Sequence, residues 1–221
     1  MKIENIEKND KLYRFMEMVL SYNEKFNLTS ITQKEQFMDK HFYDSLNILE
    51  DFDFSNKKVI DVGCGAGFPS IPLAIILKDT TFTLVESSHK KCDFLKIVKE
   101  ELNLNNIEII NSRAEDLDIS YRNYFDYAVS RAVASLNIIL ELTIPFIKVG
   151  GIGIFYKGLK YKEEINFSKK ALAILHCHYL KTIQKELPFS KESRFYIIIS
   201  KDEVSKNIYP RQFNKIKKEP L

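Results

Sequence analysis

The spacing of apolar residues predicts that the chain begins with helices and continues as alternating strands and helices. Near the N-terminus, apolar side chains recur every three or four residues and so share one helical face: Leu12, Phe15, Met16, Val19 and Leu20. A second helix is predicted from an N-cap at Thr32, with Glu35 three residues later, to about Glu50. We therefore expect residues 1–55 to form a helical N-terminal extension.

Beyond residue 56, short apolar runs alternate with helical stretches. Strands are predicted at 57–62, 81–86, 107–110, 125–129 and 151–156, and helices at 71–78, 89–104 and 135–147. This alternation is typical of right-handed βαβ units around a parallel sheet. The predicted α/β domain of residues 56–221 ends with a helix at 163–175, strands at 179–183 and 194–200, and a basic tail.

Composition excludes several classes of protein. The 221 residues are 45% hydrophobic, as in an ordinary globular chain, and no apolar run reaches the ~18 residues of a membrane span. The polar start, residues 1–7, does not resemble a secretory signal, and three scattered cysteines do not suggest a disulfide framework. We therefore expect a cytoplasmic protein with no membrane association.

The net charge of +3 is unevenly distributed along the chain. Residues 1–60 carry a net charge of −2 and residues 61–180 are neutral, whereas residues 181–221 have ten Lys or Arg against five Asp or Glu. The basic end is either a solvated edge or a phosphate-contacting surface. The first candidates for RNA contact are Arg211, Lys215, Lys217 and Lys218.

A glycine-rich loop follows the first predicted strand. Gly63, Gly65 and Gly67 form a G-x-G-x-G pattern preceded by Asp61. The dinucleotide pattern G-x-G-x-x-G fails, because its sixth position is Phe68. The observed pattern favours an S-adenosylmethionine site; a nicotinamide site and a plain βα turn are the alternatives.

Residues after the next strands extend this prediction. Glu86 ends the second strand, where a carboxylate accepts hydrogen bonds from ribose hydroxyls. Ala114 and Glu115 follow the third strand and are predicted to contact adenine, or else to form a helix turn. Arg131 follows the fourth strand, at the reactive end of the cofactor; an ion pair with Asp61 or Glu86 is the alternative.

The sequence also limits the methyl acceptor. The fourth strand lacks the proline-rich stretch common among enzymes that methylate exocyclic amines, and the three cysteines fit core positions better than a nucleophile. A ring nitrogen such as guanine N7 needs no general base, so catalysis there is mostly positioning. No catalytic residue is identified, and His176, Cys177 and His178 lack a second ligand pair for a metal.

Several segments together resemble the small-subunit ribosomal RNA (guanine-nitrogen-7) methyltransferases, also called the glucose-inhibited division protein B family. The similarity is carried by residues 22–29 (YNEKFNLT), 41–46 (HFYDSL), 61–74 (DVGCGAGFPSIPLA) and 130–136 (SRAVASL), and by an ending, YPR with KKEPL, similar to Gram-positive members. The resemblance covers nearly the whole chain. This sequence departs slightly from the family's usual residues, for example at Tyr22 and Ser70. None of these departures removes a side chain that would bind a ligand.

This resemblance implies a class I S-adenosylmethionine-dependent methyltransferase with a Rossmann-like, mostly parallel seven-stranded sheet. The implied product is 7-methylguanosine at position 527 of 16S rRNA. By position, the family's cofactor contacts fall on Gly63, Phe68, Ala114, Glu115 and Arg131.

Arg131 and His41 are the candidates for substrate binding. His41 shares one helical side with Asp44 and Ser45, so the alternative for this group is a packing contact between extension and sheet. The expected partner is 16S rRNA or the small ribosomal subunit, bound by a monomer without a metal. A methyltransferase for a small molecule or protein, and a non-catalytic cofactor-binding module, are the alternative functions.

Overall fold

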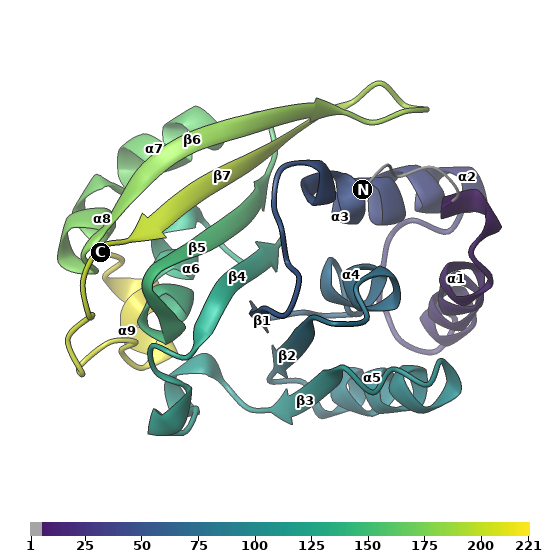
Figure 1. Cartoon of the computed structure of the whole chain (residues 1–221), viewed down its shortest axis with the longest axis horizontal. Coiled ribbons are helices and arrows are strands. Elements are labelled where there is room, and N and C mark those ends of the chain that lie inside the picture. Colours follow the sequence, from purple (N-terminus) through teal and green to yellow (C-terminus); the bar gives the residue numbers. More distant parts are fainter. Residues whose placement is uncertain (1–5) are drawn as a thin grey trace.

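The computed structural model describes residues 6–221, without the side chain of Glu7. The polar stretch at residues 1–5, part of the argument against a secretory signal, lies outside the described residues. Seven strands form one sheet in the order β3-β2-β1-β4-β5-β7-β6, in which only β7 runs antiparallel to its neighbours within the described chain (Figure 1). Their bounds are β1 Lys58–Val62, β2 Thr81–Glu86, β3 Ile107–Asn111, β4 Phe125–Arg131, β5 Ile147–Lys157, β6 Cys177–Glu186 and β7 Ser193–Lys201.

Helices cover both faces of the sheet (Figure 1). One hydrophobic cluster joins α4 and α5 to the N-terminal helices, and a second joins α6, α8 and α9 to the opposite face. The bounds are α1 Asp10–Asn23, α2 Lys34–Phe37, α3 Asp44–Leu46, α4 Ser70–Ile76, α5 His89–Glu101, α6 Leu136–Thr143, α7 Tyr161–Phe167, α8 Lys169–Ile174 and α9 Phe213–Lys218. Among the described residues, no helix is both long and apolar enough to cross a membrane.

The predicted strands and the first helix are confirmed, with shifts at their ends. Strand β1 is buried along nearly its whole length because helices cover both faces, which explains its continuous apolar run. The predicted helix 135–147 is too long: α6 ends at Thr143, and β5 begins at Ile147. Pro145, which has no N–H to donate, lies in the short 3₁₀ turn between them.

The second predicted helix differs from its prediction in start and in regularity. Gln33, and not Thr32, is the N-cap residue, and no side chain there accepts a hydrogen bond from the first turn. The helix then passes through a π-helical segment, Met38–Tyr43, before α3 and a final 3₁₀ turn at Asn47–Glu50. Wider π turns are frequent at functional sites, and this one carries His41.

The C-terminal residues predicted as a basic tail are packed against the second face of the sheet. Tyr209, Ile216 and Leu221 are buried. Arg211 forms an ion pair with the fully buried Glu141 of α6, through Nη2–Oε2 at 2.6 Å and Nε–Oε1 at 2.7 Å. This guanidinium is therefore committed to the interior, whereas the lysines of α9 remain exposed.

Candidate active site

The candidate site lies at the carboxyl ends of the parallel strands. At this point of the sheet, successive strands stop being added on one side of β1 and are added on the other side. Strand β1 pairs with β2 on one side and with β4 on the other. The loops that follow β1 and β4 therefore lead toward opposite edges of the sheet. Ligands of open α/β sheets bind at such a switch point, beyond the carboxyl ends of the strands. Residues 63–67 follow β1 at this point.

Backbone geometry explains the glycines of this loop. Gly63, Gly65 and Gly67 have φ angles of +74°, +60° and +97°, which L-residues with a Cβ rarely adopt. A Cβ on Gly67 would also lie 2.4 Å from Cγ1 of Ile71. The N–H of Gly63 donates to the carbonyl of Val85 at 2.8 Å, which ties the loop to the end of β2.

Asp61 lies beneath this loop, almost fully buried at 1% exposure. Its Oδ2 accepts a hydrogen bond from Ser70 Oγ at 2.6 Å, while Oδ1 has no partner among the described residues. Burial raises the pKa of Asp61 to about 7, against the opposing effects of Ser70 and Arg131. An unpartnered buried carboxylate oxygen of this kind favours a cationic ligand group close to it.

Glu86 holds the loop from the end of β2. Its Oε2 accepts from the N–H of Gly65 at 3.0 Å, and its Oε1 accepts from the N–H of Ser88 at 2.8 Å. The side chain is 7% exposed, so these two bonds fix the carboxylate at the edge of the loop. Each carboxylate oxygen keeps a further lone pair, which can accept a hydrogen bond from a hydroxyl group.

A small cavity of about 140 Å³ opens beside the loop. It brings together Gly63, Ala114 and Glu115 from the predicted cofactor set, and Gly65, Phe68, Glu86 and Arg131 do not line it. Its wall consists of Val62, Gly63, Val85, Ser87, Ser112, Arg113, Ala114, Glu115, Val133, Leu142 and Phe213. Phe213 comes from α9 at the far end of the chain.

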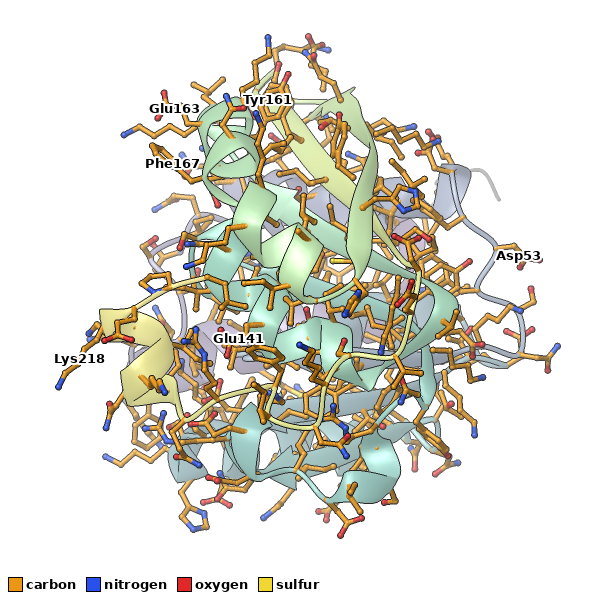
Figure 2. The ribbon with its side chains drawn as sticks, turned by 90° about the vertical axis from the view of Figure 1, so that its left-hand side faces the viewer. Asp53, Glu141, Tyr161, Glu163, Phe167 and Lys218 are labelled. Atoms are coloured by element: carbon orange, nitrogen blue, oxygen red, sulfur yellow. The ribbon has the colours of Figure 1, made fainter. Side chains whose placement is uncertain are left out.

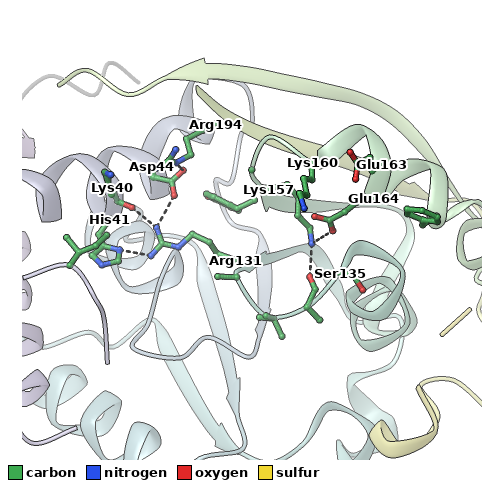
Figure 3. Close-up of a pocket in the computed structure, with 17 residues that line it drawn as sticks. Lys40, His41, Asp44, Arg131, Ser135, Lys157, Lys160, Glu163, Glu164 and Arg194 are labelled. Carbon is green, nitrogen blue, oxygen red and sulfur yellow. Dashed lines mark hydrogen bonds and ion pairs between the residues drawn. The ribbon is translucent and has the colours of Figure 1, made fainter. Parts of the chain in front are cut away.

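A larger cavity of about 840 Å³ lies over the ends of β4 and β5 (Figure 3). Its wall includes His41, Arg131, Tyr156 and Lys157. Val133 lines both cavities, and a Cβ on Gly63 would lie 2.9 Å from its Cγ2. The loop after β4 therefore separates the two cavities by little more than one side chain.

Arg131 is held by a network from the N-terminal extension (Figure 3). Its Nη1 donates to the Lys40 carbonyl and to Asp44 Oδ2, both at 3.0 Å, and its Nη2 donates to His41 Nδ1 at 2.8 Å. The anionic partner is Asp44, so the alternative of an ion pair with Asp61 or Glu86 is wrong. A guanidinium has five N–H donors, so Arg131 keeps donors for a ligand in the larger cavity.

His41 joins this network to an aromatic cluster. Its ring stacks on Phe68 with centroids 4.2 Å apart and planes 12° apart, and its Nε2 lies 2.8 Å from Thr29 Oγ1. Burial, together with the nearby Arg131, lowers the pKa of His41 to about 2. The imidazole is therefore neutral, with Nδ1 accepting from Arg131 and Nε2–H donating to Thr29.

Three aromatic side chains, those of Phe68, Tyr43 and Tyr156, occupy different places. Tyr156 lines the larger cavity and donates its hydroxyl to the Ser45 carbonyl at 2.9 Å. Phe68 is 6% exposed within the cluster around His41, and Tyr43 packs against Phe189. Sequence reasoning missed Val133, since nothing distinguishes it in the sequence, and Phe213, since its contact with Glu115 spans 98 residues.

The cysteines are core residues. Cys64, Cys92 and Cys177 are buried and unbridged, and burial raises the pKa of the Cys177 thiol to about 12. Within residues 6–221, no three His, Cys, Asp or Glu side chains gather closely enough to hold a metal ion.

Comparison with solved structures supports the fold. A SAM-dependent methyltransferase from Aquifex aeolicus superposes with a TM-score of 0.60 at 15% identity, over 81% of this chain and 97% of that chain. M. jannaschii TYW2 in complex with AdoMet superposes with a TM-score of 0.59 at 16% identity, over 77% of each chain. The fold is therefore the Rossmann-like class I methyltransferase fold expected from the sequence.

Sequence comparison gives a closer relationship. The profile of the family rRNA small subunit methyltransferase G (GidB) matches residues 8–193. The chain is 43% identical to the Ribosomal RNA small subunit methyltransferase G of Thermoanaerobacter sp. (strain X514), over 94% of this chain and 88% of the relative. The Fusobacterium nucleatum protein of the same name is also 43% identical, over 97% and 92% of the two chains. The chain therefore belongs to the rRNA small subunit methyltransferase G family.

Proposed function

We propose that this protein methylates ring nitrogen 7 of a guanine, position 527, in 16S rRNA of the small ribosomal subunit. Membership of the family supports a methyltransferase that acts on small-subunit rRNA with S-adenosylmethionine as donor. The observation that carries the proposal is the pair of neighbouring cavities that share Val133 as a lining residue, next to Gly63. One has the features of a cofactor site, and the other is large enough for a nucleotide.

The residues of the glycine loop, of the strand ends beside it and of the smaller cavity together fit S-adenosylmethionine. The orphaned Oδ1 of Asp61 suits a cationic amino-acid portion, and the absence of a Cβ at Gly63 and Gly65 allows close approach of a ligand to the backbone. Ala114 and Glu115 would contact adenine, and Glu86 would accept from ribose hydroxyls. When bound, the cofactor supplies an electrophilic methyl group on a sulfonium.

The larger cavity would take the guanine. N7 of guanine carries a lone pair and no proton, so the chain needs no general base there. The remaining N–H donors of Arg131 suit an acceptor such as guanine O6, a pairing that arginine commonly makes. Phe68 helps to hold Arg131 in this position, since the Arg131 guanidinium lies over the Phe68 ring, 5.0 Å from the ring centroid.

His41 would contribute by holding the Arg131 guanidinium in one orientation. A neutral imidazole accepts from Arg131 and so fixes the guanidinium plane, together with Asp44. Because the N–H donors of Arg131 are already fixed in place, little free energy is needed to reorganise them when the substrate binds. Such preorganisation is a large part of catalysis by positioning. We also propose that the enzyme acts in the cytoplasm as a monomer. Residues 1–55 would form a helical extension of the methyltransferase domain at residues 56–221.

Methyl incorporation tests the proposal directly. Small-subunit RNA, naked and within the subunit, would be prepared from bacteria lacking the mark and incubated with the protein and labelled S-adenosylmethionine. We expect one methyl group per RNA, located by mass spectrometry as 7-methylguanosine at position 527. Incorporation at another base, or none into either substrate, would refute the proposal.

A further inference from the structure

The C-terminal segment, residues 211–221, closes one side of the small cavity. Phe213 lines this cavity together with Ala114 and Glu115. The backbone N–H of Phe213 donates to Oε1 of Glu115 at 2.9 Å, and the Arg113 guanidinium lies 5.6 Å from the Phe213 ring centroid. Phe213 thus supplies both an apolar surface and a hydrogen bond to a predicted cofactor residue.

Several interactions anchor this segment to the domain. Arg211 donates to the buried Glu141 through its backbone N–H as well as its guanidinium. Leu221 is buried, and its carbonyl accepts from Asn137 Nδ2 at 3.5 Å. Figure 2 shows Glu141 on the face that the segment crosses, while Lys218 of α9 points away from the domain. The anchors face inward and the lysines face outward.

We propose that the Phe213 ring contacts the adenine of S-adenosylmethionine, so that the C-terminal segment is a wall of the cofactor site. This inference rests on the proposed function, because it takes the small cavity as the adenosine site. An aromatic ring is a suitable wall for a nucleobase, since every base has a π-face that stacks favourably on an aromatic side chain. The N–H of Phe213 also fixes the Glu115 carboxylate beside the same base. Phe213 is therefore a binding residue within the segment that the sequence predicts as a basic tail.

A fluorescence experiment tests the contact without depending on activity. The chain has no tryptophan, so Phe213→Trp introduces a single reporter at the cavity. Lys217→Trp is the matched control, because Lys217 is exposed on the same short helix. Titration with S-adenosylmethionine and with adenosine is expected to give a saturable change in emission for Phe213→Trp and none for Lys217→Trp.

Calorimetry provides the quantitative arm. We expect Phe213→Ala to weaken the binding of S-adenosylmethionine and of adenosine by the same factor, about tenfold, while Lys217→Ala binds like the wild type. Thermal unfolding of each variant shows whether the segment stays packed. Wild-type affinity in Phe213→Ala would overturn the inference alone. An absence of cofactor binding by the wild-type chain would overturn the proposed function and this inference with it.

Discussion

The two sides of the candidate site are built in different ways. The cofactor side is centred on the backbone turn after β1 and on Glu86 at the end of β2, which accepts from the N–H groups of Gly65 and Ser88. The acceptor side consists of side chains from distant segments, in which Arg131 meets His41 and Asp44 across 90 and 87 residues. The first is built around one loop, with Phe213 added from a distant segment, whereas the second exists only after the extension has docked on the sheet.

This difference separates binding from positioning. Changes on the cofactor side should act on the affinity for S-adenosylmethionine, whereas changes on the acceptor side should act on turnover with the affinity preserved. Variants that move both quantities together would break the distinction.

The largest effect is expected for Gly63→Val. Its φ of +74° is strained for a β-branched residue, and the new Cβ would press on Val133 between the two cavities. We expect calorimetry to show a loss of cofactor affinity of roughly 100-fold or more, from ~3 kcal/mol of strain and occlusion. Gly158→Ala is the control, since a Cβ there meets nothing within 4 Å. Unchanged affinity in Gly63→Val would refute the assignment of this loop.

Arg131→Ala is expected to have the next largest effect, on turnover. Loss of the held donors should lower kcat/KM for the RNA roughly 100-fold, or ~3 kcal/mol, with the cofactor Kd changed less than about twofold. Arg14→Ala is the matched control, because Arg14 is an exposed arginine in surface ion pairs. A cofactor affinity that falls along with turnover would place Arg131 on the cofactor side instead.

The contrast also explains how far sequence reasoning reached. The strands, the glycine loop and Glu86 were predictable because each depends on residues close together in the chain. For the network around Arg131, the sequence predicted candidate residues but not their pairing. The carboxylate that pairs with Arg131 is Asp44, and this pairing depends on how the extension docks on the sheet. Phe213 and Val133 carry no local signal, and the inward turn of Arg211 depends on Glu141, 70 residues away.

Asp61 gives the cofactor side a pH dependence of moderate size. Its pKa of about 7 means that below pH 7 the carboxyl is mostly protonated, and binding of a cationic group requires loss of that proton. We expect the affinity for S-adenosylmethionine to rise with pH between 5.5 and 7, approaching tenfold per pH unit, and then to level. Asp61→Asn should abolish this slope in calorimetric titrations, with Asp118→Asn, an exposed carboxylate, as control. A flat profile for the wild type would contradict the role of Asp61.

The smallest expected effect is on the pH dependence of stability, where the two sides oppose one another. His41 has a lowered pKa, so below about pH 6.5 the unfolded chain binds a proton that the folded chain does not, and acidification destabilises the fold. Asp61 has a raised pKa, so between its unfolded value of 3.8 and about 7 the folded chain binds the extra proton, and acidification stabilises the fold. In the wild type these slopes largely cancel between pH 4 and 6.5.

Removing one group should expose the other. In urea unfolding at pH 7 and pH 5, Asp61→Asn is expected to lose more stability on acidification than the wild type, by up to about 1.4 kcal/mol per pH unit below 6.5. Adding His41→Gln to Asp61→Asn should remove that loss, because the amide oxygen of glutamine still accepts from Arg131 but does not titrate. Equal pH slopes in the single and double variants would show that burial and the nearby Arg131 do not keep His41 neutral in the folded chain, and the orientation proposed for the guanidinium would then lose its main support.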